Sequence, residues 1–211
     1  MSRAPSASLV RPAQPADAER IGEIHAAGML RQVGAGLGRV VPPDVAALFD
    51  AEQFAGGWRV SIEEPPSAKH RVLVALDGER VVGFLGFGPV EAEADGGAAP
   101  ASGDGGAAPA SGDGGAALPA VDAEILALEV DPAYPADVHS ARLLNACADI
   151  LAMSGAESMR TWAVRGDELR QRFLTESGFA VLGLRRAYRV AGGEVVEDAW
   201  WAEIGDPAEE R

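Results

Sequence analysis

The chain has 211 residues, of which 47% are hydrophobic and 24% charged, and these values suit one globular domain with a substantial core. Eighteen basic and 32 acidic residues give a formal net charge of −14, which disfavours non-specific attraction to nucleic acid or to an anionic membrane. The single cysteine, Cys147, excludes an internal disulfide and favours a reducing compartment.

No apolar run approaches the ~20 residues of a membrane span, and the first residues, MSRAPSAS, lack the apolar stretch of a secretion signal. We therefore expect a cytoplasmic protein with neither a membrane nor a nucleic acid as partner. Alanine and glycine are abundant and Lys69 is the only lysine, a composition typical of GC-rich bacterial genomes.

The N-terminal part predicts a strand over Leu9–Arg11, a helix that starts at Pro15 and a second helix over 45–62. A β-hairpin of Arg71–Ala75 and Val81–Phe87 follows. Pro15 and Asp17 mark the start of the first helix, because proline and an acidic residue are favoured in a first helical turn. Apolar residues recur at helical spacing through 45–62. Asp77-Gly78 predicts the hairpin turn, since its glycine permits a positive φ.

A repeat interrupts the pattern after the third predicted strand. DGGAAPASG occupies 95–103 and again 104–112, and DGGAALPA follows at 113–120. The repeat has no aromatic or β-branched residue with which to build a core. We therefore expect a disordered insertion over 92–120 between the third and fourth strands, and flexible tails at 1–7 and 205–211.

The C-terminal part predicts strands at Ala123–Val130 and Met159–Val164, helices at His139–Met153 and Asp167–Ser177, and a last hairpin of Ala180–Val190 with Val195–Ile204. Asp167 is the expected N-cap of the second of these helices, and Gly178 ends it. The order of elements predicts an α/β fold with one mixed sheet, as a single domain over 8–204.

One segment predicts an anion site. In 128–144, LEVDPAYPADVHSARLL, an apolar strand runs through a loop into an amphipathic helix, and unpaired N–H groups at such a helix start can hold a pyrophosphate. The glycines that usually allow close approach are absent. Val138 and Ser140 stand in the loop, and Asp137 adds negative charge beside the expected phosphates.

Five separated phrases resemble the GNAT superfamily of acyl-CoA-dependent N-acetyltransferases: VRPAQPADAERIGEIH, VLVALDGERVVGFLGFGP, ALEVDPAY, SARLLNACADIL and DELRQRFLTESGF. The resemblance implies a central, mostly antiparallel, splayed sheet of about seven strands with about four flanking helices. It also implies transfer of an acetyl group from acetyl-CoA, the expected co-substrate, to a primary amine of a small molecule or peptide by direct attack, with no metal. Relatives are often dimers, so a monomer and a homodimer both stay open.

The resemblance further implies where acetyl-CoA binds. The expected cofactor-binding residues are Leu128, Val130, Pro135, Ala136, Asp137, Val138, His139, Ser140, Ala141 and Asp167, the first two through their backbone next to Glu129. The family has glycine in the loop where this chain has Val138, whose β-branched side chain resists a positive φ, and often a cation where it has Asp137.

The expected catalytic residues are Glu124 and Glu129 as bases and Tyr188 as the acid. The two glutamates are five residues apart, so a regular strand points them to opposite faces. Leu174 occupies the position where many relatives have the proton-donating tyrosine. Each candidate also has a plainer interpretation, a solvated strand carboxylate for each glutamate and a core residue for Tyr188.

The acceptor pocket implied by the resemblance includes the last hairpin, where Glu194, Glu197 and Asp198 would suit a cationic amine. Two alternatives to acetyl transfer stay open because of the altered loop. One is a catalytically inactive GNAT-fold protein that acts as a binding or regulatory module, and the other is transfer from a larger acyl-CoA.

Overall fold

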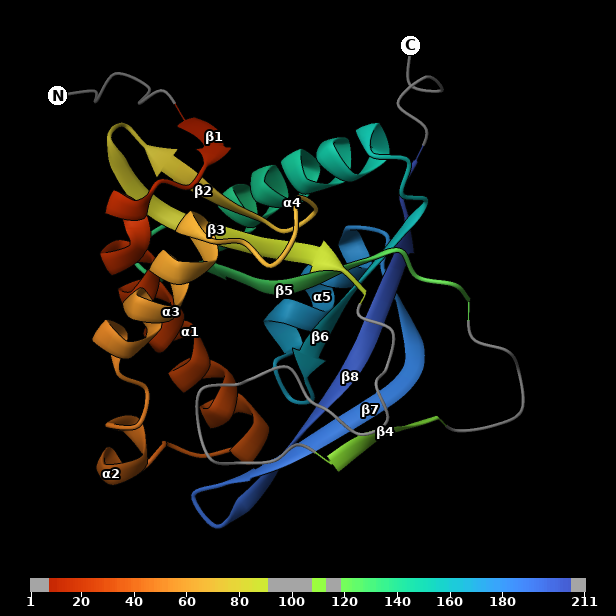
Figure 1. Cartoon of the computed structure of the whole chain (residues 1–211). Coiled ribbons are helices and arrows are strands. Elements are labelled where there is room, and N and C mark those ends of the chain that lie inside the picture. Colours follow the sequence, from red (N-terminus) through yellow and green to blue (C-terminus); the bar gives the residue numbers. More distant parts are fainter. Residues whose placement is uncertain (1–7, 91–107, 113–118, 206–211) are drawn as a thin grey trace, which may run out of the picture.

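The computed structural model describes residues 8–90, 108–112 and 119–205, and an eight-stranded sheet organises them (Figure 1). The strand order is β1-β2-β3-β5-β6-β8-β7-β4. All neighbours pair antiparallel except β5 and β6, which are parallel. The strands are β1 Ser8–Pro12, β2 Arg71–Asp77, β3 Arg80–Pro89, β4 Ala108–Gly112, β5 Ala123–Val130, β6 Ser158–Val164, β7 Ala180–Val190 and β8 Gly193–Glu203.

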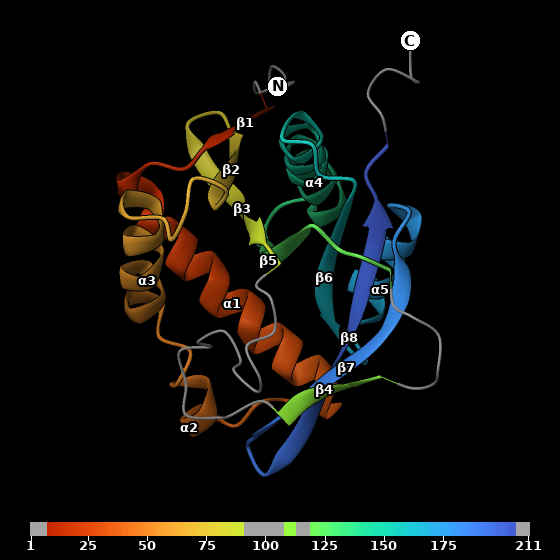
Figure 2. The same cartoon turned by 45° about the vertical axis from the view of Figure 1, so that its right-hand side comes forward.

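Helices cover both faces of the sheet (Figure 2). The helices are α1 Ala18–Leu37, preceded by a 3-10 turn at Pro15–Asp17, α2 Pro43–Ala46, α3 Ala51–Glu63, α4 Ala136–Met153 and α5 Glu168–Glu176. α1 and α3 pack on one face, and α4 and α5 on the other. The helix predicted over 45–62 is two helices, because Asp50 starts a new one: its side chain accepts a hydrogen bond from the N–H of Glu52.

The two faces carry separate parts of the core. Below α1, Ile21 and Ile24 pack on Val74 and Phe84, all nearly inaccessible to solvent. The larger cluster lies below α4 and α5 and includes Leu73, Leu85, Phe87, Ile125, Leu128, Leu143, Cys147, Leu151, Leu174 and Trp200. Burial of each such side chain stabilises the fold by about 1.5–3 kcal/mol. Burial also raises the pKa of the Cys147 thiol to about 12, so this cysteine is an unreactive core residue.

The sheet splays in its middle, between β5 and β6. Their parallel pairing covers only Ala123–Ile125 against Met159–Thr161. Beyond Ile125 the two strands diverge, and α1 and α5 lie on either side of the opening. The splay predicted from the family resemblance is confirmed.

A bulge in β5 accompanies the splay. The register against β3 shifts between Gly86 and Phe87, so that Leu126 has no partner across the strand pair. Ile125 and Leu128 both pack in the core below α4, although three positions separate them. The strand is therefore irregular at the point where β6 leaves it.

Most of the predicted insertion over 92–120, together with the tails 1–7 and 206–211, lies outside the described residues. Within the insertion, however, Ala108–Gly112 form β4, which pairs with the edge of β7. The sequence analysis predicted no strand there. An unpaired strand edge offers N–H and C=O groups to a neighbouring chain segment whatever its side chains, so the edge of β7 explains the pairing better than the sequence of β4 does.

Candidate functional site

The opening between β5 and β6 exposes main-chain groups of β5. The N–H of Asp131 donates to the carbonyl of Val82 over 2.8 Å, which makes these two residues a hydrogen-bonded pair. Hydrogen-bonded and non-bonded pairs alternate along antiparallel strands. The N–H and C=O groups of Leu128 and Val130 therefore point away from β3, into the opening where β6 has diverged.

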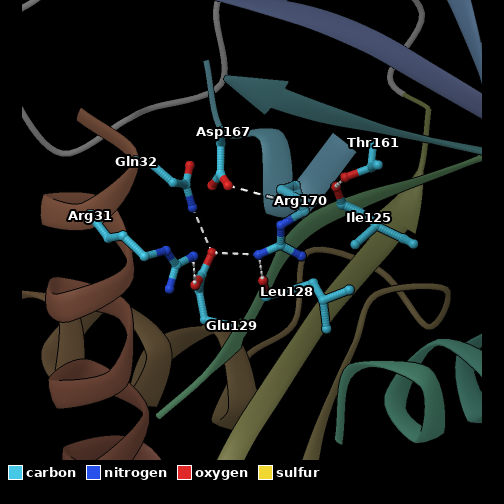
Figure 3. Close-up of polar contacts among 8 residues, drawn as sticks. All are labelled: Arg31, Gln32, Ile125, Leu128, Glu129, Thr161, Asp167 and Arg170. Carbon is cyan, nitrogen blue, oxygen red and sulfur yellow. Dashed lines mark hydrogen bonds and ion pairs between the residues drawn. The ribbon is translucent and has the colours of Figure 1, made fainter. Parts of the chain in front are cut away.

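Glu129 lies beside this opening as a buried carboxylate with three donors (Figure 3). It is 2% exposed. Its Oε2 accepts from Arg31 over 2.9 Å, and its Oε1 accepts from Gln32 over 2.5 Å and from Arg170 over 2.9 Å. Because both oxygens have charged or polar donors, the charge of Glu129 is compensated inside the protein.

The close approach of α1 to Glu129 depends on Gly28. A Cβ at Gly28 would lie 2.5 Å from the carboxyl carbon of Glu129. The carboxylate cannot turn aside, since Arg31, Gln32 and Arg170 hold it in place. Glycine at this position therefore allows α1 to lie close enough for Arg31 and Gln32 to donate hydrogen bonds to Glu129.

Arg170 reaches Glu129 from the opposite face of the sheet. It belongs to α5, which packs below the sheet, whereas Arg31 and Gln32 belong to α1 above it. Its Nη2 donates both to the carboxylate and to the main-chain carbonyl of Leu128. The side chain of Arg170 therefore runs through the opening between β5 and β6 (Figure 3).

Glu124 lies on the same face as Glu129, contrary to the prediction for a regular strand. Ile125 and Leu128 both point toward α4, so their neighbours Glu124 and Glu129 both point toward α1. The bulge at Leu126 adds the extra residue that changes the alternation. The irregular strand thus brings the two candidate bases to one face.

The partners of Glu124 come from β6. Its Oε2 accepts from the Nε of Arg160 over 2.7 Å, and its Oε1 accepts from the indole N–H of Trp162 over 3.1 Å. The Glu124 side chain is 14% exposed, compared with 3% for that of Glu129. Glu124 is therefore the more accessible of the two carboxylates.

Two of the three acids expected on the last hairpin, Glu197 and Asp198, are paired with arginines. Glu197 accepts from Arg186 over 2.5 Å, and the Arg186 guanidinium lies 4.4 Å from the ring centre of Trp162. Asp198 pairs with Arg165 and Arg185. Arginines thus compensate these two acids, whereas Glu194, the third, is exposed.

Tyr188 lies on β7, which β6 and β8 separate from β5, the strand of the two glutamates. It packs in the cluster below α1 with Val164 and Val195, and burial raises its pKa, which makes the phenol a weaker acid. This surrounding agrees with the core interpretation of Tyr188 better than with proton donation.

The predicted anion loop is the first turn of a helix. α4 begins at Ala136, with Pro135 as its N-cap, three residues earlier than the predicted start at His139. The first N–H groups of a helix have no acceptor within the helix. Val138 keeps an ordinary helical φ, since Ala191 is the only non-glycine residue with a positive φ in the described part of the chain. The strain expected at Val138 is therefore absent.

Side chains around this turn differ in their exposure. Val138 is 55% exposed and Asp137 is also exposed, whereas His139 and Ser140 are buried, and Ala141 is partly buried. Burial lowers the pKa of His139, and its buried Nδ1 has no hydrogen-bond partner. Asp137 carries a negative charge in the turn, which favours the helix itself but opposes an incoming anion.

Asp167 supplies a buried acceptor near the opening. One oxygen accepts from the main-chain N–H of Arg170 over 3.1 Å and so caps α5, as the sequence predicted. Its Oδ2 is buried and has no partner, and the residue is only 8% exposed. An unpaired buried acceptor is costly unless a donor reaches it, so this oxygen suits an N–H group of a ligand in the opening.

Sequence analysis missed Arg31, Gln32 and Arg170. These residues lie 98, 97 and 41 positions from Glu129 along the chain. No local spacing connects residues so far apart, and arginines on amphipathic helices usually face solvent. Only the three-dimensional arrangement identifies the cluster.

Lowering the pH from 6.5 to 4 should destabilise the fold through His25. Burial lowers the pKa of His25 to about 4, against the opposing effect of Glu129, and its Nδ1 accepts from the indole of Trp58 over 3.0 Å. Between these pH values the unfolded chain binds a proton that the folded chain does not, so the free energy of unfolding falls as the pH falls. Urea unfolding of wild type and His25→Gln at pH 7 and pH 4.5 measures this. An equal loss in both proteins would show that His25 contributes nothing.

None of the helices in the described ranges has the length and hydropathy that a membrane-spanning helix needs. In the same ranges, no three side chains of histidine, cysteine, aspartate or glutamate come together as a metal site.

Comparison with known proteins gives matches in structure alone. No family profile and no curated protein sequence matches the chain. Among solved structures, yncA from Salmonella typhimurium, determined with acetyl-CoA, matches with a TM-score of 0.61 and 16% identity over 96% of this chain and 97% of its own. The ribosomal-protein-alanine N-acetyltransferase of Brucella melitensis matches with a TM-score of 0.60 and 13% identity, over 92% and 99%.

The PaiA N-acetyltransferase of Thermoplasma acidophilum, solved with coenzyme A, matches with a TM-score of 0.57 and 13% identity over 93% of this chain and 99% of its own. At such low identity these likenesses show a shared fold. They extend over nearly the whole length of each chain.

Proposed function

We propose that this chain, whose fold is that of the GNAT N-acetyltransferases, transfers an acetyl group from acetyl-CoA to a primary amine of a small molecule or peptide. The observation that carries the proposal is the opening between β5 and β6, into which the main-chain groups of Leu128 and Val130 point. Two neighbours of the same fold were solved with acetyl-CoA or coenzyme A.

The residues around the opening fit such a cofactor at three points. Leu128 and Val130 offer strand-like hydrogen bonds to the amides of a pantetheine arm. The buried Oδ2 of Asp167 lacks a donor, which an amide N–H would supply. The first turn of α4, from Ala136, presents free N–H groups and the positive end of its dipole to a pyrophosphate.

Acetyl-CoA, when bound, supplies an acetyl group activated as a thioester. The chain must then accept the proton that the amine loses as its nitrogen forms the new bond to the acetyl carbon and the bond from that carbon to sulfur breaks. The sulfur leaves as the thiolate, and return of that proton converts it to the thiol. Of the two candidates, Glu124 is the better base, because its side chain is more exposed than that of Glu129 and has two donor residues, Arg160 and Trp162, whereas Glu129 has three. Glu129 instead holds Arg31, Gln32 and Arg170 in position through its three hydrogen bonds.

A second function is favoured by one observation. Arg170 runs through the opening and already donates to the carbonyl of Leu128, and Asp137 stands in the turn that a pyrophosphate would approach. If these features exclude the cofactor, the chain is a GNAT-fold binding or regulatory module without catalysis. Monomer and homodimer are both compatible with either function.

Release of CoA from acetyl-CoA in the presence of a panel of amines tests the proposed activity. A thiol reagent can report the reaction, since the only cysteine of the chain is buried and its pKa is about 12. We expect turnover with at least one amine, and a loss of kcat of about a hundredfold in Glu124→Gln. Glu176→Gln, which changes an exposed carboxylate on α5, is the control. Binding of acetyl-CoA without turnover of any amine would favour the binding module.

A further inference from the structure

We propose that Arg170 is an internal plug that closes the opening between β5 and β6 and that a cofactor must displace in order to bind. The inference rests on the proposed function, because it takes this opening as the channel for acetyl-CoA. It goes further in assigning an autoinhibitory contact to a residue of α5.

The path of the side chain supports a plug. Arg170 starts on the α5 face of the sheet and ends at Glu129, whose other donors come from α1 on the opposite face. Between these ends it crosses the level of β5, where it touches the carbonyl of Leu128 (Figure 3). Its side chain is mostly buried, with 15% of its surface exposed.

The contacts of Arg170 are those that an incoming ligand would need. The carbonyl of Leu128 points into the opening and can accept an amide N–H, but the guanidinium already donates to it. A hydrogen bond from a charged donor is stronger than one from a neutral amide, so the plug competes well for this acceptor. Asp167, whose Oδ2 has no partner, lies next to Arg170 (Figure 3).

Arg170 can leave the opening without leaving the buried charge of Glu129 uncompensated. When Arg170 withdraws, Glu129 keeps Arg31 on Oε2 and Gln32 on Oε1. Those two donors belong to α1 and do not cross the opening. The carboxylate thus has partners in both states, as a two-state contact requires, and the measured affinity falls in proportion to the fraction of molecules that are open.

Calorimetric titration with CoA of wild type, Arg170→Ala and Arg172→Ala tests the plug. Arg172 lies on the same helix but is exposed and pairs only loosely with Glu176, so it controls for the loss of an arginine from α5. We expect Arg170→Ala to bind CoA about tenfold more tightly than wild type, and Arg172→Ala to match wild type. Binding of CoA by Arg170→Ala but not by wild type would also support the plug.

The contrary outcomes distinguish failure of the proposed role of Arg170 from failure of the proposed acetyl transfer. If wild type binds CoA and Arg170→Ala binds equally or more weakly, the plug is wrong and the proposed function stands. If neither protein binds, both are wrong. Should Arg170→Ala fail to fold, Arg170→Gln retains part of the buried stem without the charge, and it should show a smaller gain in affinity in the same direction.

Discussion

Replacement of Glu129 by alanine should lower the free energy of unfolding by about 3–5 kcal/mol, the usual cost of removing one partner from a buried ion pair. The substitution removes the acceptor for Arg31, Gln32 and Arg170 at once. Arg170 then has a mostly buried guanidinium whose remaining acceptor is the carbonyl of Leu128. Urea unfolding of the purified proteins measures the loss.

Two further variants make this result specific to the buried site. Glu129→Gln retains the shape and one acceptor oxygen, so its loss should be smaller than that of Glu129→Ala. Glu176→Ala removes an exposed carboxylate whose nearest contact to Arg172 is 3.9 Å, and it should change stability by less than about 0.5 kcal/mol. Equal, small effects in Glu129→Ala and Glu176→Ala would mean that the cluster around Glu129 does not stabilise the fold.

Replacing Asp137 by arginine and Val138 by glycine should tighten CoA binding by about tenfold to a hundredfold. The first substitution reverses a charge in the opening turn of α4, and at ~5 Å with an effective dielectric of ~20 each unit charge changes the energy of a phosphate by a few kcal/mol before screening. The second removes an exposed β-branched side chain from the same turn. Calorimetric titration with CoA measures the change.

The gain should be smaller than the full electrostatic energy, because Asp137 also stabilises the helix start and glycine lowers helix propensity. Asp149→Arg is the matched control, since it makes the same charge reversal on the exposed surface of α4, about 18 Å further along the helix. A similar gain in Asp149→Arg would assign the effect to net charge. No gain in the double variant would show that this turn does not face the phosphates.

Much of the fold could be predicted because its signals are local. The hairpin of β2 and β3 follows from two β-rich runs around Asp77-Gly78, and α5 follows from Asp167 before an amphipathic stretch. The first turn of α4 was also marked, since an acidic residue, Asp137, follows Pro135 there. The sequence analysis placed these residues in a loop and began the helix at His139, because it followed the strand-loop-helix pattern and did not use this local signal.

The parts that could not be predicted depend on contacts between distant segments. The bulge at Leu126 lies in an unbroken apolar run, so the sequence could not show that Glu124 and Glu129 share a face. The position of Arg170 in the opening depends on where α5 packs relative to β5. Pairing of β4 with β7 depends on a free strand edge, which is a property of the folded sheet.

The central claim is that the opening between β5 and β6 binds the pantetheine arm of acetyl-CoA. Calorimetric titration of the wild-type chain with acetyl-CoA, with a buffer blank, tests it most directly. The account predicts saturable binding of one molecule per chain with a dissociation constant in the micromolar range, weakened by Arg170 and Asp137. No heat and no thermal stabilisation at millimolar acetyl-CoA, with wild type and with Arg170→Ala, would contradict it and leave a GNAT fold that serves as a binding or regulatory module.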